Sequence, residues 1–346
     1  MDNLDVEHKT LIGNVKYEYQ NNSNFDINLI YNYSHLNGIL KFLSYFKSQF
    51  LLIYLVLIGK PDCIHFQWLK VPILDYIIVI VLKILLPNSR FVFTAHNLLP
   101  HDSGNKFKWI FAKIYKLVDH IIVHDHSTKT EMKLLFSVQQ EKVFVIPHGL
   151  LKINQTEQSP RAKSRNKITF SLIGFLNNYK GVDILINAWL SSNILKNNKT
   201  LQLVIAGKAS PEIKNKLLQL NGVTNSKVLD KFLSDNEFND LIEKSDVLIF
   251  PYRKISQSGV LLTALAHRKP VLVSRVGGLT QPFEVGKIGW TLNDLSYESL
   301  KDSLEYISMN PEEINQIKND ECLWGNIYNY YNWGKISEKT CLVYNL

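Results

Sequence analysis

Cysteine is scarce in this sequence. Cys63, Cys322 and Cys341 are too few and too scattered for a disulfide framework, and no Cys-x-x-Cys pair indicates a zinc site. The first ten residues are polar and acidic, so we expect no secretory signal ahead of the fold. The chain also lacks the composition of a disordered protein, since 46% of its residues are hydrophobic and 20% are charged. We therefore expect a reduced, folded, cytosolic protein.

An uninterrupted apolar run long enough to cross a membrane is also missing. The run Phe50–Gly59 is half of the roughly 20 residues that a bilayer requires. The longer stretch Val71–Leu86 contains Asp75 and Lys83, and a charge at mid-membrane costs about 2.5–3.5 kcal/mol. We expect both stretches to be buried helices of an α/β core, and we predict no spanning helix.

Basic residues outnumber acidic ones, 39 to 31, and most of this excess lies between His35 and Val118, where ten basic residues face three acids. Near an anionic membrane each such residue contributes about 1 kcal/mol. Phe107–Val118 alternates bulky apolar groups with lysines, which is typical of an interfacial helix. A core helix with a solvated basic face has the same pattern. Nucleic acid fits less well, because no recognised binding motif accompanies the basic residues.

The length and the pattern of elements predict two domains. Strands are expected at Cys63–Trp68, Phe91–Ala95, His120–His124 and Lys142–Ile146, and then at Lys167–Leu172, Leu201–Ala206, Ser226–Leu229, Asp246–Phe250, Val271–Ser274 and Trp290–Leu292. Helices are expected between them, which predicts two doubly wound parallel sheets that bind ligands at their carboxyl edges. The expected boundaries are 1–152, a polar linker 153–166, 167–321 and a C-terminal segment 322–346. No first strand can be assigned within residues 1–40.

Two loops of the second domain have the composition of an anion site. Gly174 ends one strand, and Lys180 stands just ahead of a helix expected from Val182. Lysine and a helix amino-terminus both favour phosphate, although a plain glycine turn has the same signature. After the strand Asp246–Phe250, the sequence Ser256-Gln-Ser-Gly-Val260 opens another helix. Its free amides could bind a diphosphate, or a serine could simply cap it.

These motifs occur together in a recognisable order. Taken with Val145–Gly149, Ala206-Gly207 and Gly277-Gly278, they resemble a retaining GT-B glycosyltransferase of the GT4 family, often called group 1. The Ser-Gln-Ser-Gly-Val loop is similar to a subset frequent in bacterial capsule, exopolysaccharide and O-antigen assembly. The resemblance covers roughly residues 60–346 and implies a GT-B fold, with C-terminal helices that cross back to the first domain.

The resemblance also implies roles for single residues. Lys180 matches the lysine that holds the donor diphosphate, and His96 matches the strand-end histidine that faces the donor sugar; these two are the catalytic candidates. The remaining donor-binding candidates are Gly174, Asn177, Ser256, Gln257, Ser258, Gly259, Val260, Thr263 and Glu284. His101 and Asp102 are candidates for the acceptor.

The chain departs from the family pattern at two of these positions. Thr263 stands where the family usually has a glutamate, and Asn177 lies in the region of a usual arginine. These departures keep open a catalytically weak or inactive partner subunit. An epimerase of the same fold has little support in the sequence.

The resulting expectation is a hexosyl transfer from a UDP- or GDP-sugar to a lipid-linked oligosaccharide, with retained configuration. No Asp-x-Asp cluster suits a metal-dependent mechanism, and neither a zinc site nor a cofactor beyond the nucleotide sugar is expected. The basic first domain suggests peripheral contact with the anionic inner face of the plasma membrane. Other histidines, including His65, lie on the expected sheet edge of the first domain, and for His124, His126 and His148 a structural role is the alternative to a functional one.

Overall fold

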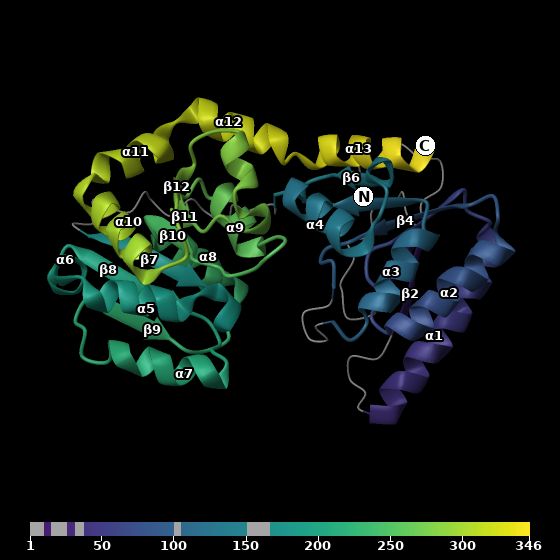
Figure 1. Cartoon of the computed structure of the whole chain (residues 1–346), viewed down its shortest axis with the longest axis horizontal. Helices are drawn as coiled ribbons and strands as arrows, with labels where there is room; N and C mark the ends of the chain where they lie inside the picture. The colour runs from purple at the N-terminus through teal and green to yellow at the C-terminus, as the bar shows by residue number, and fades with distance from the viewer. Residues whose placement is uncertain (1–9, 15–25, 32–37, 100–104, 151–166) are drawn as a thin grey trace. The chain divides into compact units, whose positions relative to one another are not determined.

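The computed structural model describes residues 10–14, 26–31, 38–99, 105–150 and 167–346 (Figure 1). The chain divides into two compact units. The first comprises Met1–His124, Lys129–Ile146 and Trp333–Leu346, and the second comprises Asp125–Thr128 and Pro147–Asn332. The linker expected at 153–166 lies outside the described residues.

The first unit contains a four-stranded parallel sheet in the sequential order β3-β4-β5-β6. Its strands are β3 (Cys63–Phe66), β4 (Arg90–Thr94), β5 (His120–Val123) and β6 (Val143–Val145). Its helices are α1 (Gly38–Gly59), α2 (Pro72–Leu85), α3 (Lys108–Leu117), α4 (His126–Phe136), which begins within the second unit, and α13 (Trp333–Asn345). A separate parallel pair, β1 (Thr10–Asn14) and β2 (Asp26–Tyr31), supplies strands that the sequence pattern did not locate.

Helix α3 decides between the two interpretations of Phe107–Val118. Its bulky apolar side chains are buried in the core of the first unit: Ile110, Phe111, Ile114 and Tyr115. The exposed side carries Trp109 and Lys113, with the Lys113 ammonium 5.1 Å from the centre of the Trp109 ring. The structure therefore supports the core helix rather than the interfacial one.

Helix α1 corrects the expectation of a buried helix at Phe50–Gly59. The helix begins at Gly38 and has 22 residues, so by length and apolar composition it could cross a membrane. Only 28% of its most apolar 18-residue window is buried. The sequence pattern did not predict the full length of this helix, because Lys41 and Lys47 interrupt the apolar run.

The second unit is a doubly wound sheet of six parallel strands in the order β12-β11-β10-β7-β8-β9. The strands are β7 (Ile168–Ile173), β8 (Leu201–Ala206), β9 (Ser226–Leu229), β10 (Val247–Phe250), β11 (Val271–Val273) and β12 (Gly289–Thr291). The helices are α5 (Val182–Ser191), α6 (Asn193–Asn197), α7 (Pro211–Leu217), α8 (Asp235–Lys244), α9 (Gly259–Ala266), α10 (Tyr297–Met309), α11 (Pro311–Asn319) and α12 (Glu321–Tyr330). The prediction of two parallel α/β sheets is confirmed.

Local sequence explains these elements. Strand β10 is a continuous apolar run, as expected of a strand buried on both faces by helices, and all four of its residues are buried. Helix α8 begins with a capping box, in which Ser234 and Glu237 satisfy each other's backbone amides. Strands β7 and β10 are neighbours, although β8 and β9 separate them in the chain. The strand order therefore reverses between them, and this is where open α/β sheets bind ligands.

The C-terminal segment divides later than the boundary expected at 322. Trp324 of α12 is fully buried in the second unit, where its indole nitrogen donates to the Ile317 carbonyl at 2.7 Å. Ile336 and Val343 of α13 pack instead on strands of the first unit. The reason is the apolar surface of α12, which completes the core around α9.

A buried hydrogen bond ties α1 to α2. The Tyr45 hydroxyl donates to Asp75 at 2.6 Å, and burial raises the pKa of this carboxyl to about 6. We predict that Tyr45→Phe lowers the free energy of unfolding by about 1–3 kcal/mol, because it leaves a buried carboxyl oxygen without its donor. Urea denaturation measures this, with the exposed Tyr54→Phe as the matched control. Equal stability of the two variants would contradict the prediction.

Candidate functional site

The loops that follow β7 and β10 meet where the strand order reverses. Gly174 directly follows β7, and a β-carbon at this position would lie 2.7 Å from the Lys180 Nζ atom and 3.2 Å from Val260 Cγ2. Gly174 also has a φ of +107°, which favours glycine. The structure therefore brings together three predicted donor-site residues, two from the loop after β7 and one from the start of α9.

The Lys180 ammonium is buried. Only 4% of the residue is exposed, and its Nζ atom donates to the Ile173 carbonyl at 3.2 Å. The same atom lies 5.4 Å from the centre of the Tyr252 ring. Among the described residues, no carboxylate forms an ion pair with it. Burial lowers the pKa of Lys180 to about 8. A cation held in this way is suited to bind an anionic ligand.

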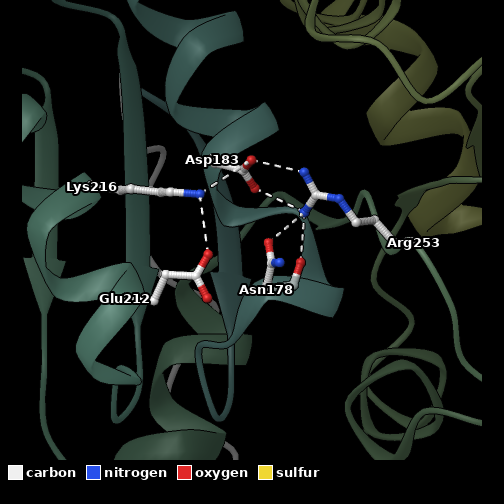
Figure 2. A network of polar contacts seen from close by, with 5 residues as sticks. All are labelled: Asn178, Asp183, Glu212, Lys216 and Arg253. Atoms are coloured by element: carbon white, nitrogen blue, oxygen red, sulfur yellow. Dashed lines mark hydrogen bonds and ion pairs between the residues drawn. The ribbon is translucent and has the colours of Figure 1, made fainter.

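A polar network fixes the short 3-10 helix Asn178–Lys180, which carries this lysine (Figure 2). The Arg253 guanidinium binds both carboxylate oxygens of Asp183, at 2.8 and 2.9 Å, and donates to the Asn178 carbonyl at 2.6 Å. Lys216 lies 3.6 Å from the same carboxylate and 3.7 Å from Glu212. These contacts hold the pKa of Asp183 below its usual value, against the opposing effect of its burial. The loop after β10 is thereby fixed to the helix that presents Lys180.

The start of α9 satisfies both interpretations of its sequence. The Ser258 hydroxyl caps the helix by accepting from the Leu261 amide at 3.3 Å. The Leu261 amide is not one of the three that were predicted to bind phosphate. Those three belong to Ser258, Gly259 and Val260. Gly259 is exposed, and a β-carbon there would have no atom within 4 Å. The capping serine and an anion at these amides are therefore compatible.

The other predicted donor residues differ in what their side chains contact. The Thr263 hydroxyl donates to the Gly259 carbonyl at 2.9 Å, within its own helix. The Asn177 Oδ1 atom is buried and has no hydrogen-bond partner within the part of the chain that the structure describes. Ser256 and Gln257 are half-buried, and Glu284 is exposed. The Ser256 carbonyl accepts from the Gly278 amide at 2.9 Å, so the double-glycine turn supports this loop.

The first unit holds a separate network of aromatic and polar side chains around His96. The rings of His96 and Trp68 stack at 4.4 Å with an interplanar angle of 7°. His96 Nδ1 lies 3.0 Å from His124 Nε2, and His96 Nε2 lies 3.1 Å from the Gln67 Oε1 atom. His65 continues the network through Gln67, at 3.1 Å, and through the Tyr344 hydroxyl of α13, at 2.6 Å.

One hydrogen bond of this network fixes the position of a ring proton on His124. The Ile146 carbonyl can only accept, so His124 Nδ1, at 2.9 Å, carries a proton. His124 Nε2 can then accept from His96 Nδ1, which lies 3.0 Å away. Burial lowers the pKa of His65 to about 4, so His65 is neutral at pH 7.

The sequence analysis placed His96, His65 and His124 on the expected sheet edge but did not include Gln67 or Trp68. Both follow directly on β3, so their position after a strand of the same sheet was the available signal. His101 and Asp102 lie outside the described residues. Among the residues that are described, no group of three or more His, Cys, Asp or Glu side chains could hold a metal ion.

The segment from Gly174 to Gly181, which contains Lys180, is called the lysine loop. It is closely packed at Gly181. This glycine has a φ of +65°, and a β-carbon there would lie 2.0 Å from the Pro251 carbonyl oxygen. We predict that Gly181→Ala lowers the midpoint of thermal unfolding by several degrees, because the strained backbone has to move. Gly325→Ala in α12, where a β-carbon meets nothing within 4 Å, is the control and is expected to change the midpoint little. A stable Gly181→Ala protein would refute this geometry.

The sequence matches two protein families. Residues 167–310 match the glycosyl transferases group 1, and residues 17–150 match glycosyltransferase family 4. An uncharacterized glycosyltransferase of Methanocaldococcus jannaschii is 26% identical over 65% of this chain. The alpha-D-kanosaminyltransferase of Streptomyces kanamyceticus is 24% identical over 38% of it. The matched regions span 60% and 34% of the lengths of these two relatives.

Solved structures show the fold. HepE of Anabaena, in complex with UDP and glucose, has a TM-score of 0.69 and 15% identity over 92% of this chain and 85% of its own. The sucrose-phosphate synthase of Thermosynechococcus elongatus has a TM-score of 0.71 and 15% identity over 98% of this chain and 88% of its own. The predicted GT-B fold is confirmed. The chain therefore contains two glycosyltransferase domains, one that matches group 1 and one that matches family 4, and it has the GT-B fold.

Proposed function

We propose that this protein transfers a hexosyl group, with retention of configuration, from a UDP- or GDP-sugar to a lipid-linked oligosaccharide during bacterial capsule, exopolysaccharide or O-antigen synthesis. The observation that carries the donor assignment is the buried Lys180 ammonium, which borders Gly174 beside the start of α9. Complexes of HepE with UDP and with UDP-glucose favour UDP over GDP in this proposal.

Departure of the nucleotide places negative charge on the diphosphate. Lys180 would neutralise part of this charge, and the amides at the start of α9 would donate to the same oxygens. Groups that are fixed before the reaction stabilise such a transition state without reorganisation, and this is commonly the largest single contribution to catalysis. Arg253 would act indirectly, because it holds the short helix that carries Lys180. That the reaction needs no metal ion and no cofactor remains a prediction.

The acceptor and its location are proposed on different grounds. With retained configuration, the acceptor hydroxyl attacks from the face that the leaving group departs from. The excess of basic residues between His35 and Val118 suits an acceptor on an anionic membrane, at its cytosolic face. The family resemblance assigns His96 to the donor sugar, and His124 would set which ring nitrogen of His96 carries the proton.

A catalytically weak or inactive partner subunit is the second candidate. Thr263 favours it, because its hydroxyl is bonded within α9 and offers no carboxylate to a donor sugar. Hydrolysis or transfer of a nucleotide sugar by the pure protein distinguishes the two candidates.

We predict that Lys180→Met weakens UDP binding about 10- to 100-fold, since a hydrogen bond to a charged group is lost. Uridine, which lacks the diphosphate, is expected to bind both proteins equally. Because the pKa of Lys180 lies near 8, the cation is lost above this pH. The affinity of the wild-type protein for UDP should therefore fall between pH 7 and 9.5, and that of the variant should change less. Isothermal titration calorimetry measures all of these affinities.

Lys227→Met, on the exposed end of β9, is the matched control and should bind UDP as the wild type does. Unchanged UDP affinity in Lys180→Met would remove the lysine from the donor site. An equal loss for uridine would show a structural rather than an electrostatic effect.

For His96 we predict that substitution by alanine reduces turnover of the nucleotide sugar on the order of 100-fold, through loss of a contact in the transition state. The circular dichroism spectrum should remain that of the wild type. Release of UDP in a coupled assay gives the rate. Turnover near the wild-type rate in a folded His96→Ala protein would show that this histidine does not act on the substrate.

A further inference from the structure

The outward surface of α1 is apolar along almost its whole length. Nine of its large apolar side chains are at least 40% exposed: Ile39, Leu40, Phe42, Leu43, Phe46, Phe50, Leu51, Tyr54 and Ile58. The rings of Phe42, Phe46 and Phe50 contact one another in sequence, with centroids 6.4 and 4.9 Å apart. With Tyr54 and Ile58 they form a row at a spacing of four residues. We call this row the aromatic ridge.

The opposite side of α1 is attached to the first unit. Leu52 and Val56 belong to its core, and Tyr45 donates to Asp75 of α2 from a buried position. In Figure 1, α1 lies lengthwise against α2. A helix held along its side in this way is oriented to lie in the plane of a membrane rather than to cross it.

The charged residues near the aromatic ridge indicate what kind of surface it binds. Between residues 38 and 60 the charged side chains are Lys41, Lys47 and Lys60, with no acid among them. All three are exposed. Apolar residues that enter a bilayer next to lysines that reach the headgroups are typical of helices that bind anionic lipid. A water-exposed surface of this kind is unusual in a soluble protein, where large apolar patches mark binding sites.

We propose that α1 is an in-plane membrane anchor, whose aromatic ridge inserts at the acyl boundary of an anionic bilayer while its lysines contact the lipid headgroups. This assigns the membrane contact to α1 rather than to α3. It adds a surface to the membrane location proposed above, but it does not depend on glycosyl transfer, because vesicle binding is measured without donor or acceptor.

Sedimentation with vesicles of phosphatidylglycerol and phosphatidylcholine tests this anchor in the full-length protein. The wild type is expected to bind these vesicles and to retain a substantial bound fraction in 0.5 M NaCl, where electrostatic attraction alone is screened. The triple variant Phe42→Ser, Phe46→Ser, Phe50→Ser should bind at least tenfold more weakly. These side chains are 40–61% exposed, so the variant should keep the circular dichroism spectrum of the folded wild type.

Leu218→Ser with Phe232→Ser, two exposed apolar positions of the second unit, is the matched control and should bind vesicles like the wild type. Vesicle binding that survives the triple substitution, or that disappears entirely in 0.5 M NaCl, would overturn the proposal. A dimer seen by light scattering without lipid, and abolished by the triple variant, would also overturn it and assign the ridge to a second copy of the chain.

Discussion

The proposed donor site depends on one electrostatic constraint, an ammonium group that is buried with no carboxylate ion-paired to it among the described residues. Burial disfavours the charged form of Lys180 and lowers its pKa to about 8, while the Ile173 carbonyl and the Tyr252 ring only partly compensate. An anion bound beside Lys180 would offset the free-energy cost of burying this charge. The geometry therefore favours binding of a diphosphate over a purely structural role.

The buried position of Lys180 results from the order of the strands and from two glycines. Neighbouring strands β7 and β10 deliver the lysine loop and the α9 loop to one edge of the sheet. Gly174 leaves room for the ammonium, and Gly181 lets the chain pass the Pro251 carbonyl. Arg253 and Asp183 then hold the short helix in place (Figure 2). The histidine network of the first unit is built in a similar way, from residues at or just beyond the carboxyl ends of adjacent strands.

Most strands and the loops of the proposed donor site could be predicted from the sequence. Parallel α/β units have their functional residues at strand ends, and β-branched runs followed by glycines indicate where strands end. The strands from β3 onward, the lysine loop and the α9 loop were located in this way. The pattern failed for α1, where Lys41 and Lys47 divided a long apolar helix and hid both its length and its exposure. It also missed Gln67 and Trp68, which follow β3 directly, because their position after a strand does not show which residues of the neighbouring strands they contact.

The most direct test of the account is an NMR titration of the Lys180 side chain, with lysine labelled at the ε-carbon and Lys180→Met used to assign the signal. The account predicts a pKa near 8 in the free protein and a rise of at least one unit when UDP is bound, because the diphosphate stabilises the charged form. A pKa near 10.5 in the free protein, or one that UDP leaves unchanged, would contradict it.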